Sequence, residues 1–218
     1  MCPSIICLHA AESNVEIMEQ SLSETPFHIN HIVDTYLLKM IREQRPLSEQ
    51  KEYAFQKITS IIEQQPDFIF ITCTNYIVLL EQMDLETTIP LLKIDDLLFE
   101  QLKEIQVPIK ILFTNKQTIE GTMTRLEQSI PSTLDIEVVY IPEVFDWYLA
   151  GDKTRHDQKV QSILLNLDSP QHILAVAQLS MAKSAENYSK LSGKQVLSPV
   201  TSLKNKHNNF FNKKYTHY

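Results

Sequence analysis

Glycine is scarce in this chain, which has three glycines among its 218 residues, Gly121, Gly151 and Gly193. Loops that cradle phosphate groups need several closely spaced glycines, because their backbone must adopt positive φ angles and approach the phosphate closely. The sequence therefore excludes GxGxxG and Walker-type loops. The nucleotide cofactors that those loops hold are excluded with them.

Cysteine pairs and metal-binding motifs are also missing. The three cysteines, Cys2, Cys7 and Cys73, form no CxxC pair. Their odd number and wide spacing indicate reduced thiols in a cytoplasmic protein rather than a disulfide framework. No HExxH motif occurs, and His28 and His31 stand three apart on an expected strand, which points them to opposite faces. We therefore expect no metal.

Long apolar runs and excess positive charge are absent as well. No run of 18 apolar residues occurs, so we expect no membrane-spanning helix, and no signal-type segment follows the N-terminus. The net charge of −7 argues against attraction to nucleic acid or to an anionic membrane. The exception is the basic C-terminal segment with Lys204, Lys206, Lys213 and Lys214, which we interpret as a solvated end of an acidic protein.

What the chain does contain is a regular alternation of strand-like and helical segments. Short apolar runs predict strands over 4–9, 68–71, 109–113, 136–141 and 173–177, and alternating apolar residues predict a strand over 27–33. A brief extended piece is expected at 89–94. Between these strands, apolar residues at helical spacing predict helices, including one long helical region over 144–165. Strands that alternate with helices of this length predict an α/β fold with parallel sheets.

Two of the expected strands end in a small polar cluster. The run DFIFITCTNY, residues 67–76, places Cys73 between two threonines, and the run HILAVAQLS, residues 172–180, has Gln178 at the matching place. Parallel α/β proteins present reactive groups at the carboxyl ends of their strands. Segments 5–9 and 110–114 also line up, which predicts two related halves. Coincidence among generic strand–helix units is the alternative.

In their order along the chain, several segments resemble the aspartate/glutamate racemase superfamily, which also includes hydantoin racemases, maleate isomerases and arylmalonate decarboxylases. The matching segments are 8–16, 32–38, 72–75 (TCTN), 90–95, 113–118 and 177–182 (AQLSMA). The resemblance implies two pseudo-symmetric α/β lobes, each a parallel sheet flanked by helices, with the active-site cleft between them. Lobe 1 would be 1–94 plus 195–218, with Cys73, and lobe 2 would be 95–194, with Gln178.

The resemblance also implies a small-molecule carboxylate as substrate, catalysis without pyridoxal phosphate or another cofactor, and a homodimer. Racemases of this superfamily use two cysteines on opposite faces of the substrate carbon, one thiolate removing the α-proton and the other thiol delivering one. Here the second position is Gln178, and a carboxamide cannot shuttle protons near neutral pH. Racemase activity therefore does not follow from the resemblance.

We assign Cys73 as the candidate general base or nucleophile, because backbone amides at the start of a helix stabilise a thiolate. A small buried hydrophobic residue is the alternative. Polar residues at the strand ends of both halves are candidates for binding the substrate: His9, Thr74, Asn75, Thr114, Asn115, Thr118, Gln178 and Ser180. Helix caps and structural hydrogen bonds would explain each of them singly.

The hypothesis is a cofactor-independent enzyme that acts on a small carboxylate with a single cysteine. The rival hypothesis is a non-catalytic relative that binds a small anion or assembles with partners, because loss of one of two catalytic cysteines is what a decaying enzyme would show.

Overall fold

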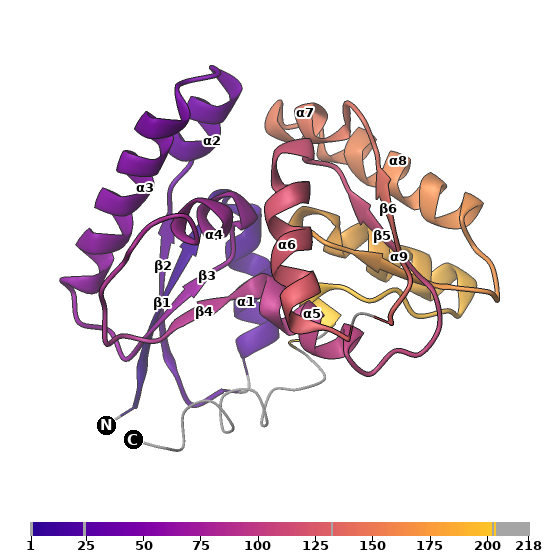
Figure 1. The fold of residues 1–218 in the computed structure, drawn as a ribbon, viewed down its shortest axis with the longest axis horizontal. Helices are drawn as coiled ribbons and strands as arrows, with labels where there is room; N and C mark the ends of the chain where they lie inside the picture. Colours follow the sequence, from indigo (N-terminus) through magenta and orange to yellow (C-terminus); the bar gives the residue numbers. More distant parts are fainter. Residues whose placement is uncertain (1, 24, 132, 202, 204–218) are drawn as a thin grey trace. The chain divides into compact units, whose positions relative to one another are not determined.

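The computed structural model describes residues 2–23, 25–131, 133–201 and 203 (Figure 1). They divide into two compact units. Within the described residues, unit 1 comprises 2–20 and 25–94, and unit 2 comprises 21–23 and 95–203. The basic segment that begins at Lys204 lies outside the described residues.

Unit 1 is built on a four-stranded parallel sheet in the order β2-β1-β3-β4. Its strands are β1 (Ser4–His9), β2 (His28–Val33), β3 (Phe68–Ile71) and β4 (Leu91–Lys93). Its helices are α1 (Ser13–Leu22), α2 (Tyr36–Arg42), α3 (Leu47–Ile62) and α4 (Thr74–Leu80). The central strands β1 and β3 are continuous apolar runs whose inner residues are buried, as expected where helices cover both faces of a parallel sheet.

Unit 2 is built on a three-stranded parallel sheet in the order β6-β5-β7. Its strands are β5 (Ile109–Phe113), β6 (Ile136–Tyr140) and β7 (Ile173–Val176). Its helices are α5 (Ile94–Leu102), α6 (Ile119–Ser129), α7 (Val144–Leu149), α8 (Lys153–Asn166) and α9 (Ala182–Ser192), with short 3₁₀ turns η1 (Lys116–Thr118) and η2 (Leu179–Met181). The expected α/β class and parallel pairing are confirmed.

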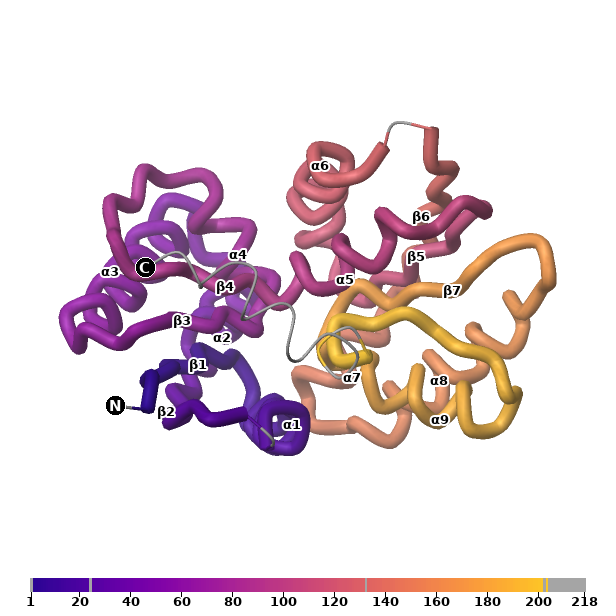
Figure 2. Tube along the Cα trace, turned by 90° about the horizontal axis from the view of Figure 1, so that it is seen from below, coloured from indigo at the N-terminus to yellow at the C-terminus, as the bar shows by residue number. Residues whose placement is uncertain are grey.

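Alternate residues of β5 and β7 supply two separate cores, one on each face of the unit 2 sheet. Leu112 and Val176 pack with residues of α7, α8 and α9, whereas Ile111 and Ala175 pack with residues of α5 and α6. Figure 2 shows α8 and α9 on one side of these strands and α6 on the other. The period of two along each strand produces this division.

The two units repeat the same hydrogen-bond register at the carboxyl ends of their central strands. The amide of Thr72 donates to the carbonyl of Leu8 over 3.0 Å, and the amide of Ala177 donates to that of Leu112 over 3.0 Å. Cys73 and Gln178, one residue further on, therefore occupy equivalent positions. The sequence comparison of 5–9 with 110–114 was one residue out of register, because it paired Leu8 with Phe113.

Two further expectations need correction. The long helical region predicted over 144–165 is interrupted at Gly151, whose φ of +85° ends α7, and Asp152 then caps α8 by accepting from the amide of Arg155 over 3.1 Å. Segment 195–218 was assigned to lobe 1. Its described residues Val196 and Leu197 pack in the cores of unit 2, and Leu197 pairs in parallel with Ala175 beside β7.

A helix with the length and apolarity needed to cross a membrane is not found in the described part of the chain.

Candidate functional site

Cys73 lies where β3 ends and α4 begins, in the position predicted for it. It is the N-cap residue of α4, with extended backbone angles, and its side chain is 7% exposed. Thr74 and Asn75 follow as the first residues of the helix and are also buried. Unit 1 thus brings these three candidates together at the carboxyl end of a central strand, where parallel α/β folds carry their sites.

His9 ends β1 beside them and is fully buried. The hydroxyl of Thr72 donates to the carbonyl of Leu8 over 3.1 Å, so it accepts from Nδ1–H of His9 over 2.8 Å. The other ring nitrogen, Nε2, then accepts from Nδ1–H of His31 over 2.8 Å. Burial, with a smaller effect from His31, lowers the pKa of His9 to about 3. His9 is therefore a neutral imidazole that holds Thr72, the residue before Cys73.

Cys7 completes a cluster with these two histidines. The register of β1 on β2 places Cys7 beside His31, and the ligand atoms of Cys7, His9 and His31 all lie within 4.8 Å of one another. Cysteine and histidine ligands suit Zn²⁺ or Cu⁺. However, His9 and His31 hydrogen-bond to each other through two of these potential ligand atoms. Burial also raises the pKa of the Cys7 thiol to about 12, which disfavours the thiolate that a metal binds. Sequence reasoning paired His31 only with His28 and missed this cluster. The absence of a bound metal stays a prediction.

Sequence reasoning also missed a buried carboxylate near Cys73. Asp34 follows β2 and accepts from the amide of Tyr36 and the hydroxyl of Tyr53, each over 2.9 Å, and from the hydroxyl of Tyr76. Burial and the Asp34 carboxylate raise the pKa of Tyr76, and Cys73 lies close enough to raise it further. The signal available in the sequence was Asp34 itself, a carboxylate directly after an expected strand.

In unit 2 the carboxamide of Gln178 is the centre of the hydrogen-bond network. Its Oε1 accepts from the amide of Thr114 over 2.9 Å, from the hydroxyl of Thr114 over 2.8 Å and from the amide of Asn115 over 3.1 Å. Its Nε2 donates to the hydroxyl of Thr118 over 3.3 Å. All four residues are buried. Three of the polar residues expected to bind substrate in this unit, Thr114, Asn115 and Thr118, are thus engaged by Gln178.

The remaining candidates in unit 2 have simpler roles. Asn115 caps η1, because its side-chain oxygen accepts from the amide of Gln117 over 3.1 Å, as the cap alternative predicted. Ser180 lies two residues after Gln178 in η2 and is half-buried. None of the hydrogen bonds described for Gln178 goes to Ser180.

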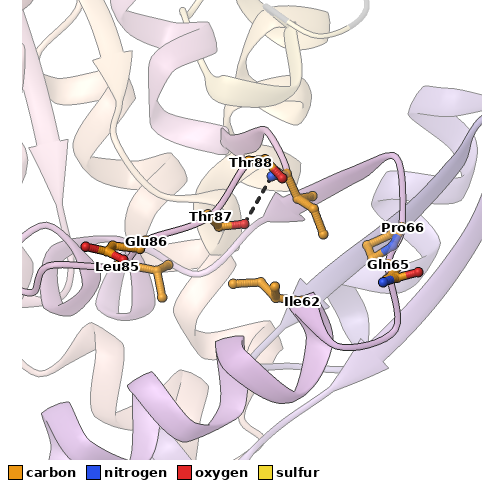
Figure 3. Close-up of a pocket in the computed structure, with 8 residues that line it drawn as sticks. Ile62, Gln65, Pro66, Leu85, Glu86, Thr87 and Thr88 are labelled. Carbon is orange, nitrogen blue, oxygen red and sulfur yellow. Dashed lines mark hydrogen bonds between the residues drawn. The ribbon is translucent and has the colours of Figure 1, made fainter.

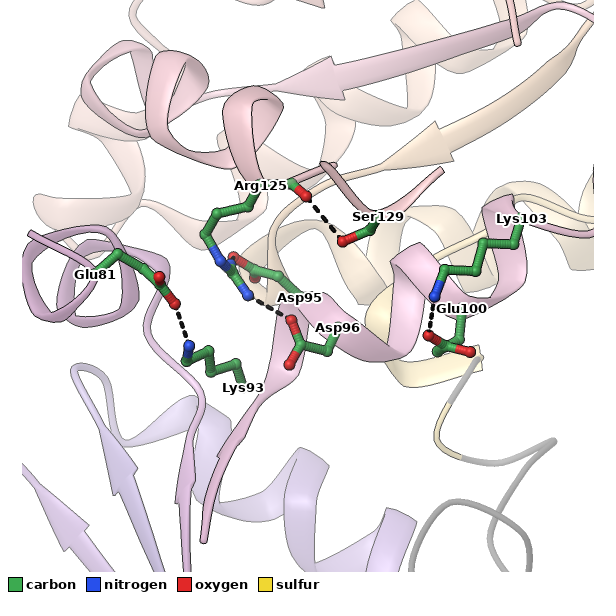
Figure 4. A network of polar contacts seen from close by, with 8 residues as sticks. All are labelled: Glu81, Lys93, Asp95, Asp96, Glu100, Lys103, Arg125 and Ser129. Carbon is green, nitrogen blue, oxygen red and sulfur yellow. Dashed lines mark hydrogen bonds and ion pairs between the residues drawn. The ribbon is translucent and has the colours of Figure 1, made fainter. Parts of the chain in front are cut away.

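Charged side chains elsewhere in each unit are paired with one another. In unit 2, Arg125 of α6 bonds Asp95 over 3.1 Å and also bonds Asp96, at the start of α5 (Figure 4). In unit 1, Lys93 pairs with Glu81. The Asp95 side chain is 1% exposed, so its pairing with Arg125 prevents the cost of an isolated buried charge. These contacts fix neighbouring elements within each unit.

A surface hollow of about 850 Å³ occurs in unit 1, at the amino ends of the strands, whereas Cys73 lies at their carboxyl ends. It is lined by residues that precede β3 and β4 and by the end of α3: Ile62, Gln65, Pro66, Leu85, Glu86, Thr87, Thr88 and Ile89 (Figure 3). The amide of Ile89 donates to the Thr87 hydroxyl over 3.0 Å. The lining has no cysteine or histidine, so the hollow lacks the groups that the candidate chemistry needs.

No protein-family model and no curated protein matches this sequence. Solved structures match it in fold. A glutamate racemase from Francisella tularensis subsp. tularensis SCHU S4, in complex with D-glutamate, has a TM-score of 0.71 at 11% identity, over 98% of this chain and 82% of that chain. An aspartate racemase from Picrophilus torridus has a TM-score of 0.70 at 12% identity, over 93% of this chain and 91% of that chain.

An allantoin racemase from Klebsiella pneumoniae has a TM-score of 0.61 at 12% identity, over 93% of this chain and 85% of that chain. At these identities the likeness establishes the fold. The chain therefore has the two-lobed α/β architecture of glutamate, aspartate and allantoin racemases, as the resemblance implied.

Proposed function

We propose that this protein is a cofactor-independent enzyme that acts on a small carboxylate, with Cys73 as its general base or nucleophile. The observation that carries the proposal is the place of Cys73, a buried thiol at the carboxyl end of the central strand β3, in a fold shared with racemases. The D-glutamate complex of one such structure supports a small carboxylate as the ligand class.

A single thiol restricts the chemistry that is available. The Cys73 thiolate would remove a proton from the carbon next to the carboxylate and would return a proton to the same face of that carbon. Gln178, at the equivalent position of unit 2, has no proton that it can transfer near neutral pH. Exchange of the α-proton with retained configuration is therefore the expected elementary reaction. Decarboxylation and thiol addition are the other reactions that one thiol permits.

Incubation in D₂O tests this proposal. Amino acids of both hands, hydroxy acids and dicarboxylic acids would be followed by proton NMR for loss of the α-proton signal, and by chiral chromatography for inversion. We expect deuterium to enter at least one acid with retention. Replacement Cys73→Ala should lower the exchange rate by about 10² to 10⁴, the usual contribution of a positioned acid–base group.

Cys2→Ser is the matched control, because Cys2 is an exposed thiol far along the sequence from the site and its loss should leave exchange unchanged. Exchange that persists in Cys73→Ala would refute the role of this thiol. Exchange coupled to inversion would reveal a second base and would also contradict the single-thiol mechanism. No exchange or decarboxylation with any acid would favour the non-catalytic alternative.

That alternative, a relative that binds a small anion without catalysis, is favoured by one observation. The donors Thr114 and Asn115 are already engaged by Gln178, as in a site that has lost its reaction. The pH dependence of Cys73 alkylation in the Cys2→Ser background separates the two. Reaction with an apparent pKa at or above about 8.5, the ordinary cysteine value, and no protection by dicarboxylates, would support the non-catalytic function.

A further inference from the structure

We propose that the Gln178 carboxamide is a built-in ligand that occupies, within unit 2, a binding site for one oxygen of a carboxylate. Removing this side chain should open the site to carboxylates from solution. The inference deepens the proposed function, on which it rests for the class of ligand, but it requires no chemistry at Cys73.

The geometry around Oε1 of Gln178 is that of an oxyanion site. Two backbone amides from the consecutive residues Thr114 and Asn115 and the hydroxyl of Thr114 converge on this one oxygen, at 2.9, 3.1 and 2.8 Å. Consecutive backbone N–H groups that point at one acceptor form an anion-binding concavity. A neutral carboxamide oxygen and a carboxylate oxygen are both acceptors that these donors can satisfy.

The orientation of the carboxamide follows from its partners. Three hydrogen-bond donors surround Oε1 of Gln178, so Nε2 lies on the other side and donates to the hydroxyl of Thr118 over 3.3 Å. The Thr118 hydroxyl in turn donates to the carbonyl of Asn115 over 3.0 Å. Thr114 and Thr118 are each 1% exposed, so water does not replace these bonds easily. An acceptor is therefore required at this point, and Gln178 supplies it from inside the chain.

The equivalent position in unit 1 has a different side chain. Cys73 stands where Gln178 stands, by the shared hydrogen-bond register, and Ala10 and Ala11 stand where Thr114 and Asn115 stand. A cysteine side chain is shorter than glutamine and has no oxygen. The unit 2 site is therefore occupied by a side chain of the same protein because position 178 is a glutamine.

Chemical rescue of a truncated side chain tests the inference. Gln178→Ala removes the carboxamide, so we expect a lower midpoint of thermal unfolding and a saturable rise of that midpoint with sodium acetate. Trp147, the one tryptophan of the chain, packs against a core of unit 2 and reports its unfolding by fluorescence. Gln178→Met is the matched control, because methionine fills the space without an oxygen, and acetate should not raise its midpoint.

A second variant, Gln178→Glu, keeps the inference testable if the alanine variant does not fold. We expect it to fold at neutral pH, to be more stable there than Gln178→Met, and to lose this advantage as acid protonates the carboxylate. Absence of rescue in a folded Gln178→Ala protein, equal rescue in Gln178→Met, or a Gln178→Glu protein as unstable as Gln178→Met would each overturn the inference.

These measurements are repeated in the Cys73→Ala background. Acetate rescue that persists there supports the unit 2 site even where the D₂O experiment refutes catalysis by Cys73. Loss of rescue in that background contradicts a site built from unit 2 residues alone. The two proposals thus fail separately.

Discussion

At the scale of single residues, burial decides which polar groups can take part in proton transfer. His9 is a candidate substrate-binding residue by its place at a strand end, yet both of its ring nitrogens are engaged, by Thr72 and His31. Its pKa of about 3 leaves it neutral near pH 7, without an additional proton to give. We therefore interpret His9 as a positioning residue for Thr72 and the chain that leads to Cys73.

His9 should make stability fall in acid. Its pKa is lowered from 6.5 to about 3 by burial, so below pH 6.5 the unfolded chain binds a proton that the folded chain does not. The contribution of neutral His9 to the free energy of unfolding is therefore complete above pH 6.5 and is lost as the pH falls towards 3. For one proton, the slope is at most about 1.4 kcal/mol per pH unit. Urea unfolding between pH 7 and pH 4 would measure it.

The variant His9→Gln should show a shallower loss of stability over this range, since glutamine does not titrate. His28, an exposed residue of the neighbouring strand β2, offers the control, and His28→Gln should keep the wild-type slope. Equal slopes in wild type and His9→Gln would show that His9 is not the group that titrates. The burial of His31 lowers its pKa as well, while Glu19 opposes this effect, so part of the slope should remain.

The candidate site could be predicted from the sequence only in part. Strand ends placed Cys73, Gln178, Thr114 and Asn115 at carboxyl edges, because apolar runs that stop at polar residues are visible in one dimension. The partners of those residues were not predictable. Thr114 and Gln178 lie 64 positions apart, and Tyr76 and Asp34 lie 42 apart, so their contacts depend on how strands and helices pack.

At the scale of elements, the sequence patterns predicted the bounds of β1, β3 and β5 to the residue and those of β2, β4, β6 and β7 to within two residues. The register between the two halves could not be predicted in this way, because a strand that is buried on both faces is apolar throughout and looks the same after a shift of one residue. The comparison of the two halves was therefore out by one residue. The break at Gly151 was also missed, since apolar spacing continues on both sides of it.

The described residues after α9 should stabilise unit 2. Leu197 is 7% exposed in a core of that unit, and its amide and carbonyl bond Leu174 and Val176 over 2.9 Å each. We expect Leu197→Ala to reduce the free energy of unfolding by about 2 to 4 kcal/mol, through lost apolar contact and the cavity that remains. Denaturant unfolding followed by Trp147 fluorescence measures this change.

Leu191 provides a matched comparison only six positions earlier, at the end of α9. Its side chain is 71% exposed, so Leu191→Ala should change stability by no more than about 0.5 kcal/mol. If Leu197→Ala were as mild as Leu191→Ala, segment 195–203 would not contribute to unit 2, and its assignment to lobe 1 would become the better one.

At the scale of the whole molecule, net charge determines which partners are attracted. The chain carries −7, with 27 acidic and 20 basic side chains. Binding of nucleic acid draws most of its free energy from phosphate contacts, which need an excess of positive charge on the protein. We therefore keep the prediction that this protein does not bind nucleic acid. The homodimer likewise stays a prediction, which light scattering would test.

Fluorescence anisotropy with labelled single-stranded DNA tests the charge argument. We expect no rise in anisotropy at physiological salt, because like charges repel and salt screens what attraction remains. A variant lacking residues 204–218, which include the four lysines of the basic segment, should behave in the same way. Binding that weakens with salt and disappears in the shortened variant would identify the segment as a nucleic-acid contact.

Composition and residue order were sufficient to predict the α/β class, the parallel strands, the absence of phosphate-binding loops, and the placement of a cysteine and a glutamine at the ends of two similar strands. These properties depend on composition and on the order of residues along the chain. The hydrogen bonds from the amides of Thr114 and Asn115 to Gln178, and the one between His9 and Thr72, depend on how the chain packs. A hydrogen bond forms between groups that strand register and burial bring within about 3 Å, and those are properties of the folded chain.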